Sequence, residues 1–145
     1  MSTRELQQQL IENLHEWQKL ENAQITLTGS VREQTSSPVV ALVMEIIQRD
    51  SEMHHRVQQL IIDSLESKVV GMEPADVDIV REQLQKHLSM EAETVRLAKE
   101  SLAALAGRQF VIQEFLMDFL RRDEEKHHDL LVALDRYLGP ESAKA

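Results

Sequence analysis

The sequence predicts an all-α protein: an antiparallel four-helix bundle made of two similar helical hairpins. Helix breakers are few, with four glycines and three prolines in 145 residues, whereas the helix-favouring Leu, Glu, Gln, Ala and Arg are common. A seven-residue motif, Arg49–His55, returns as Arg122–His128 with five identical positions, and apolar residues flank both copies at matching places. Apolar residues make up 42% of the chain, enough for one core, so residues 1–145 are expected to form a single domain.

The first helix is expected over residues 3–24. Apolar side chains recur there at three- and four-residue spacing, which predicts one buried stripe: Leu6, Leu10, Leu14 and Trp17. A connector is expected over residues 26–37, because Gly29 and Ser30, and then Ser36, Ser37 and Pro38, are turn and breaker signals.

The other three helices are expected over residues 38–67, 73–107 and 108–138. Ser37 as N-cap, with Pro38 in the first turn, predicts a firm start for the second helix. Gly71 and Gly107 fit the ends of the second and third helices. Because the turns at these two glycines are short, an up-down-up-down order is favoured over one with a long crossover between the second and third helices.

The formal net charge of -9 disfavours contact with nucleic acid or with an anionic membrane surface, since both need a basic face. No apolar run approaches the roughly 18 residues of a spanning helix, and the first residues lack the apolar core of a signal peptide. The absence of cysteine excludes disulfides, thiolate zinc sites and cysteine nucleophiles. A cytoplasmic location is the default expectation.

Helical geometry, at about 100° per residue, sorts the charged side chains of the repeated motif by face. On the second helix, Asp50 and His54 fall within the apolar stripe or at its edge. On the fourth helix, Asp123 and His127 do the same, and Glu124 lies at the border. Each copy therefore offers a carboxylate and an imidazole one turn apart on one face. The other acids and histidines of the motif are expected on the opposite, solvated face: Glu52, His55, Glu125 and His128.

The third helix adds an acid and an imidazole in the reverse order. Glu91 stands in the apolar stripe, where an apolar residue is expected, and His87 lies one turn earlier at its edge. Folding the helices about the two glycine turns places the three histidines in one layer and the three acids in the next, roughly 6 Å away. We therefore expect a group of metal ligands with these members: Asp50, His54, His87, Glu91, Asp123, Glu124 and His127.

Buried carboxylates need partners, because each unpaired ionised carboxylate costs on the order of several kcal/mol or more. One or two divalent metal ions would satisfy the whole group, and mixed nitrogen and oxygen donors suit iron, manganese or zinc. Acids that do not bind directly would orient the imidazoles. A hydrogen-bonded Asp–His network without metal is the alternative explanation of the same pattern.

The two motif copies, Asp50–His55 and Asp123–His128, set in two helical hairpins, resemble the ferritin-like/rubrerythrin superfamily of carboxylate-bridged di-metal bundles. The signature of that family is Glu-x-x-His on the second and fourth helices and a lone Glu on the first and third. Glu124 and His127 match it on the inward face, while Ser51 replaces the acid before His54. The remaining positions of the signature would fall to Glu91 on the third helix and to Glu21 or Glu16 on the first.

The resemblance implies a metal-binding bundle that holds one or two iron ions and is linked to oxygen or peroxide chemistry. Manganese or zinc would suit the same donors. A homodimer or larger homo-oligomer is expected. The alternative function is a non-catalytic helical interaction protein, dimeric, whose Asp–His pairs are structural.

Overall fold

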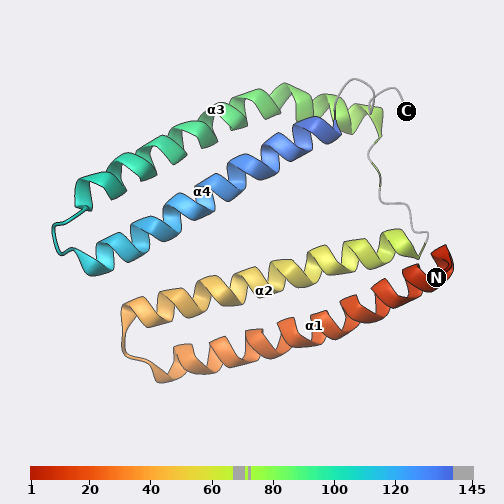
Figure 1. Cartoon of the computed structure of the whole chain (residues 1–145), viewed down its shortest axis with the longest axis horizontal. Coiled ribbons are helices and arrows are strands. Elements are labelled where there is room, and N and C mark those ends of the chain that lie inside the picture. Colours follow the sequence, from red (N-terminus) through yellow and green to blue (C-terminus); the bar gives the residue numbers. More distant parts are fainter. Residues whose placement is uncertain (67–70, 72, 139–145) are drawn as a thin grey trace. The chain divides into compact units, whose positions relative to one another are not determined.

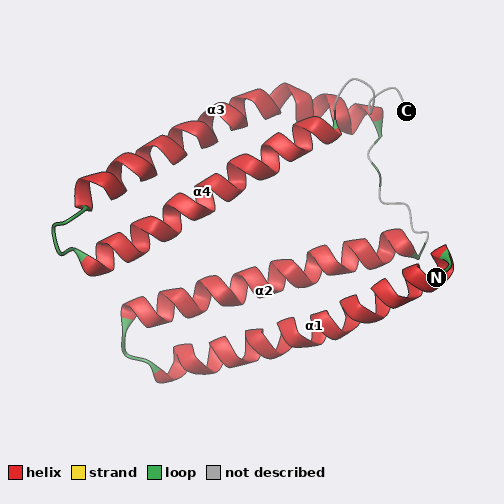
Figure 2. Cartoon of the chain, viewed as in Figure 1, coloured by secondary structure: helices red, strands yellow, loops and turns green. Residues whose placement is uncertain are grey.

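The computed structural model describes residues 1–66, 71 and 73–138, and the described residues form four helices and no strand (Figures 1 and 2). The helices are α1 (Thr3–Gln34), α2 (Pro38–Leu65), α3 (Pro74–Leu105) and α4 (Val111–Tyr137). Helix α1 packs along α2, and α3 packs along α4, each pair as an antiparallel hairpin. The predicted all-α class and the two helical hairpins are confirmed.

The chain divides into two compact units, Met1–Gly71 and Met72–Ala145, and each unit holds one hairpin. The up-down-up-down order of a single domain over residues 1–145 stays a prediction. The predicted end of the second helix falls on residues 67–70, which lie outside the described residues. None of the described helices is long and apolar enough to cross a membrane.

The predicted connector over residues 26–37 is wrong, because α1 continues through it to Gln34. Gly29 lies inside the helix, and its helical cost of roughly 1 kcal/mol is small beside the contacts that this stretch makes with α2. Thr28 is buried there, and Arg32 Nη1 donates to Gln48 Oε1 at 2.7 Å. The turn is therefore short, and Ser37 caps α2 as predicted by accepting a hydrogen bond from the Val40 amide at 3.3 Å.

The turn between α3 and α4 is longer than the turn between α1 and α2. Helix α3 ends at Leu105 and α4 begins at Val111, so the fourth helix starts three residues later than residue 108, where it was expected. Gly107 has a φ of 71°, in the left-handed region that favours glycine, as expected for a residue just beyond a helix end.

The two hairpins are built in the same register. Positions of α2 and α4 correspond at a spacing of 73, the spacing of the repeated motif. Positions of α1 and α3 correspond at a spacing of 70, because Glu21 faces His54 in the first hairpin as Glu91 faces His127 in the second. At that spacing Leu14 pairs with Leu84, and Thr28 pairs with Ala98, and all four are buried.

The contact between α1 and α2 is unusually polar. Several uncharged or acidic side chains are buried in this hairpin: Gln18, Glu21, Thr28, Ser51 and Gln58. Much of its apolar surface remains exposed, including Trp17, which was expected in the core and is 55% exposed. Figure 1 shows the two helices lying side by side over most of their length. Polar side chains therefore join α1 to α2 together with two buried apolar ones, Leu14 and Ile62.

Candidate metal centre

The second hairpin brings three of the predicted ligands together. Glu91 of α3 and Glu124 and His127 of α4 each offer one ligand atom, and these atoms all lie within 4.8 Å of one another. The Nδ1 atom of His127 lies 3.8 Å from Glu91 Oε1 and 3.6 Å from Glu124 Oε2. Glu124 and His127 share a face of α4 because they are three residues apart, and Glu91 completes the group from the facing helix.

The two distances from His127 Nδ1 approach those expected around a common metal ion, and the two glutamate donors lie within 4.8 Å of each other. Two donor atoms bound about 2.1 Å from one ion lie roughly 3.0–3.6 Å apart, depending on the coordination geometry. The two distances from His127 Nδ1 differ from this range by at most a few tenths of an ångström. All three residues are half-buried, so the group is partly desolvated and still reachable from solvent.

Asp123 lies on the other side of the His127 ring. Its Oδ2 is 3.3 Å from Nε2 of His127, and its Oδ1 is 2.7 Å from Nζ of Lys126. Asp123 was expected among the metal ligands, but the structure places it at the ring nitrogen that faces away from the two glutamates. A carboxylate in this position orients an imidazole and fixes which of its nitrogens carries the proton.

Thr94 belongs to the same cluster and was missed in the sequence. Its hydroxyl lies 3.0 Å from Glu124 Oε2 and 3.4 Å from Glu91 Oε2, and 2.9 Å from the backbone carbonyl of Glu91. A threonine inside a helix usually bonds to a carbonyl of the preceding turn, so the residue type alone gave no signal. Its contact with Glu124 depends on how α3 and α4 are aligned.

His87 is not part of the cluster, and the predicted level of the third helix is wrong. Pivoting about Gly107 would set His87 opposite His127. The turn between α3 and α4 extends to Phe110 instead, so its midpoint lies closer to α4 than Gly107 does. As a result Glu91, rather than His87, lies opposite His127. His87 is left exposed, one turn away.

The first hairpin holds a smaller version of the cluster. The Nδ1 atom of His54 lies 3.2 Å from Oε1 of Glu21, whose side chain is only 8% exposed. Ser51, buried, stands at the position that Glu124 occupies in α4. Asp50 is exposed. Of the two acids expected as alternatives on the first helix, Glu21 faces His54, whereas Glu16 is exposed and pairs with Lys19 at 2.5 Å.

The sequence-predicted layers of three histidines and three acids would combine residues of both hairpins, and they stay a prediction. Within single hairpins, the structure brings together four of the seven expected ligands: Glu91, Asp123, Glu124 and His127. His54 is placed with a partner from α1 that was not among the seven.

The expected solvated face of the motif is only partly solvated. Glu52 is exposed, but His55, Glu125 and His128 are half-buried. Glu125 binds Nη1 of Arg121 at 3.0 Å and Nζ of Lys99 at 3.5 Å. The ion pair of Glu125 with Lys99 joins α4 to α3, so part of the face that was expected to be solvated lies beside the helix contact.

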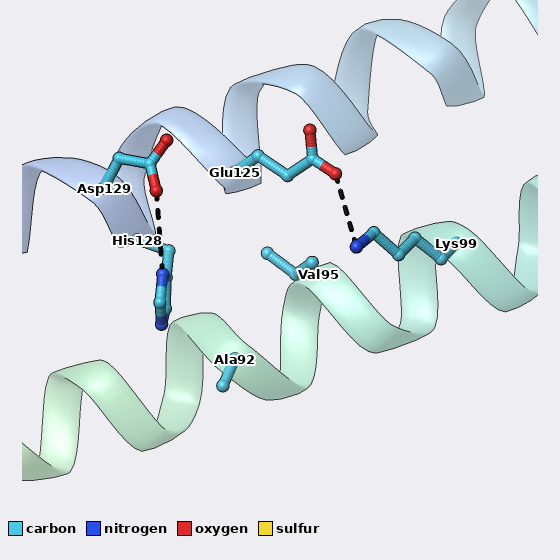
Figure 3. Close-up of a pocket in the computed structure, with 6 residues that line it drawn as sticks. All are labelled: Ala92, Val95, Lys99, Glu125, His128 and Asp129. Carbon is cyan, nitrogen blue, oxygen red and sulfur yellow. Dashed lines mark ion pairs between the residues drawn. The ribbon is translucent and has the colours of Figure 1, made fainter. Parts of the chain in front are cut away.

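A shallow groove runs along this part of the second hairpin (Figure 3). Its charged side chains pair with one another: Lys99 with Glu125, and His128 Nδ1 with Asp129 Oδ1 at 3.9 Å. Nearby, a hydrogen bond from Arg121 lowers the pKa of Asp118, so that carboxylate stays ionised and is held by a cation. Glu125 and Asp118 therefore have lysine or arginine partners, whereas the neighbour of Glu91 and Glu124 is His127.

Comparison with known proteins finds no matching family model, no matching curated protein and no matching solved structure.

Proposed function

We propose that the second hairpin binds a divalent metal ion through Nδ1 of His127 and the carboxylates of Glu91 and Glu124. The observation that carries the proposal is the convergence of these three donors, from two helices, within 4.8 Å. Two carboxylates so close together repel each other, and a bound cation removes that repulsion. Asp123 accepts from Nε2–H of His127 in this arrangement, which leaves the Nδ1 lone pair to the metal.

Iron is the metal that we favour, with manganese and zinc as the other ions that one nitrogen and two carboxylate donors suit. Three protein ligands leave positions open for water or a small molecule, as in metal sites that react with substrates. The repeated motif and the matched register of the two hairpins support a ferritin-like bundle and iron chemistry linked to oxygen or peroxide. Asp50, His54 and His87 are not needed for this site.

A second candidate function is a non-catalytic helical interaction protein, assembled as a homodimer. It is favoured by the pair of Glu21 and His54, which forms a structural contact without a third ligand. Large apolar side chains that are exposed on the described helices also favour it, among them Trp17, Leu20, Leu60 and Leu130.

Elemental analysis of the untagged full chain, before and after addition of Fe(II) in air, separates the two functions. The metal-binding proposal predicts about one ion per chain, and its loss in the double variant Glu91→Gln with Glu124→Gln. This variant keeps the shape of both side chains and removes both charges. If no preparation contains metal and the protein is a dimer by sedimentation, the second candidate stands and the first is rejected.

A further inference from the structure

We infer that Thr94 is a positioning residue of the metal site, which holds the Glu124 carboxylate beside His127. This inference rests on the proposed function and adds to it a residue that touches no metal. Thr94 is half-buried on α3, and its hydroxyl reaches carboxylates from both helices of the hairpin. The shorter of these two contacts, 3.0 Å to Glu124 Oε2, crosses from α3 to α4.

Thr94 differs from the helical threonines Thr26 and Thr28 in having a side-chain acceptor on the facing helix. A hydroxyl inside a helix has one hydrogen, and it usually donates to a backbone carbonyl three or four residues earlier. Thr26 does so to Asn22 at 3.2 Å, and Thr28 does so to Gln24 at 2.7 Å. Thr94 has the same option in the carbonyl of Glu91 at 2.9 Å, and in addition it has an ionised acceptor across the contact. Hydrogen bonds to charged acceptors are the stronger ones, so the carboxylate competes well for the hydroxyl proton.

The first hairpin supplies an internal comparison. At the spacing that relates α1 to α3, Thr94 corresponds to Gln24, and at the spacing that relates α2 to α4, Glu124 corresponds to Ser51. Both partners of the hydrogen bond are therefore missing from the hairpin that lacks the third ligand. The pairing of Thr94 with Glu124 accompanies the complete cluster, as expected if its role is to serve that cluster.

A glutamate has three rotatable side-chain bonds, and in a half-buried site it can turn toward solvent. The bond from Thr94 restricts Glu124 to the orientation in which its carboxylate faces His127 Nδ1. A carboxylate oxygen that accepts this bond retains a lone pair for the metal, and the second oxygen remains available. Loss of a partner that orients a ligand typically lowers metal affinity on the order of 10–100-fold.

The test is titration of the full chain with Co(II), followed by the visible absorption of the bound ion, which reports its coordination. Thr94→Val replaces the hydroxyl by a methyl group of similar size, and Thr94→Ser keeps the hydroxyl. We expect Thr94→Val to weaken Co(II) binding by about tenfold or more and to change the absorption spectrum, whereas Thr94→Ser keeps both close to those of the natural protein. Thr26→Val, a matched change in α1, should leave both unchanged.

Equal affinity and an identical spectrum for Thr94→Val and the natural protein would overturn the inference while leaving the metal site in place. Absence of Co(II) binding in the natural protein would overturn the proposed function, and this inference with it. Circular dichroism checks the fold of each variant. If Thr94→Val does not fold, Thr94→Ala removes the same hydroxyl without adding bulk to the helix contact, and the same two readouts apply.

Discussion

The two hairpins place a glutamate and a histidine at corresponding positions and surround them differently. In the first, Glu21 is buried and meets His54 alone. In the second, Glu91 is half-buried and meets His127 together with Glu124, where the first hairpin has a serine. The comparison teaches that the Glu21–His54 pair is a buried contact between two helices, whereas the Glu91–His127 pair is more exposed and gains a third donor, Glu124.

The two helix contacts also differ in how many polar side chains they bury. The α1–α2 contact buries Gln18 and Gln58 as well as Leu14 and Ile62, and Glu21 is buried in the same hairpin. The α3–α4 contact buries Leu84 and Ala98, and the acids of the cluster, Glu91 and Glu124, are half-buried. Thr94 and His127 are the neighbours of Glu91 and Glu124 at this contact, and neither is a lysine or arginine. A bound cation would therefore relieve the repulsion between the two acids.

The largest expected effect is the loss of tight metal binding in Glu124→Gln. This change removes one of three donors and its charge, so we expect metal affinity to fall on the order of 100-fold or more. Glu125→Gln is the matched control, because the neighbouring residue pairs with Arg121 and lies outside the cluster. Titration with Mn(II) or Co(II) measures both variants, and an equal loss in the two would show that bulk charge, rather than the cluster, attracts the metal.

The next effect sharpens the comparison by converting one hairpin into the other. Ser51→Glu with Gln24→Thr gives the first hairpin the same set of residues as the second, so we expect a second metal ion to bind. Because Ser51 is buried, the metal-free variant should be less stable than the natural protein by about 1–3 kcal/mol. Binding stoichiometry and melting with and without metal check both points, and an unchanged stoichiometry would contradict the equivalence of the two positions.

A smaller effect separates structural from functional histidines in the absence of metal. His54→Ala leaves the buried carboxylate of Glu21 without the partner at 3.2 Å, and we expect a loss of about 1–3 kcal/mol in the free energy of unfolding. His127→Ala removes the partner of two acids that solvent can reach, and it leaves no buried group unpaired. We therefore expect the free energy of unfolding to fall by less than about 1 kcal/mol. Urea denaturation in the presence of a chelator measures the difference, and equal costs would argue against the distinction.

The smallest effect concerns the length of α1. Replacing Gly29 by Ala in a continuous helix should raise the free energy of unfolding by about 0.5–1 kcal/mol, because alanine has less backbone freedom to lose. The added methyl would lie 3.4 Å from Nε2 of Gln48, the end of a flexible side chain, so space permits it. No gain, or a loss, in urea denaturation would indicate that this stretch is the connector that the sequence pattern predicted.

The helices were predictable because their signals are local. Apolar spacing and the cap at Ser37 fixed most helix starts, and Gly107 marked the end of the third helix. The error at Gly29 has a physical cause: a single glycine is a weak breaker when the surrounding helix packs well against a neighbour. Packing between helices is a tertiary property, which a local pattern does not contain.

The site was predictable only where the repeated motif carried it. The spacing of Glu124 and His127, and the odd place of Glu91 in an apolar stripe, identified three members of the cluster. Thr94 was missed, and Glu21, the partner of His54, was left as one of two alternatives with Glu16, because both contacts depend on the alignment of paired helices. A shift of the pivot by a few residues moved His87 away from the cluster, and turn length is the feature that sequence periodicity specifies least.

The central claim is that His127 binds a metal ion, whereas His54, at the corresponding position of the first hairpin, forms a structural contact with Glu21. The most direct test is to measure the metal content of His127→Ala and His54→Ala side by side. Both untagged proteins would be exposed to Fe(II) in air, desalted and analysed for iron per chain. We predict that His127→Ala retains essentially none, while His54→Ala retains the content of the natural protein. Equal iron in both variants, whether kept or lost, would contradict the account.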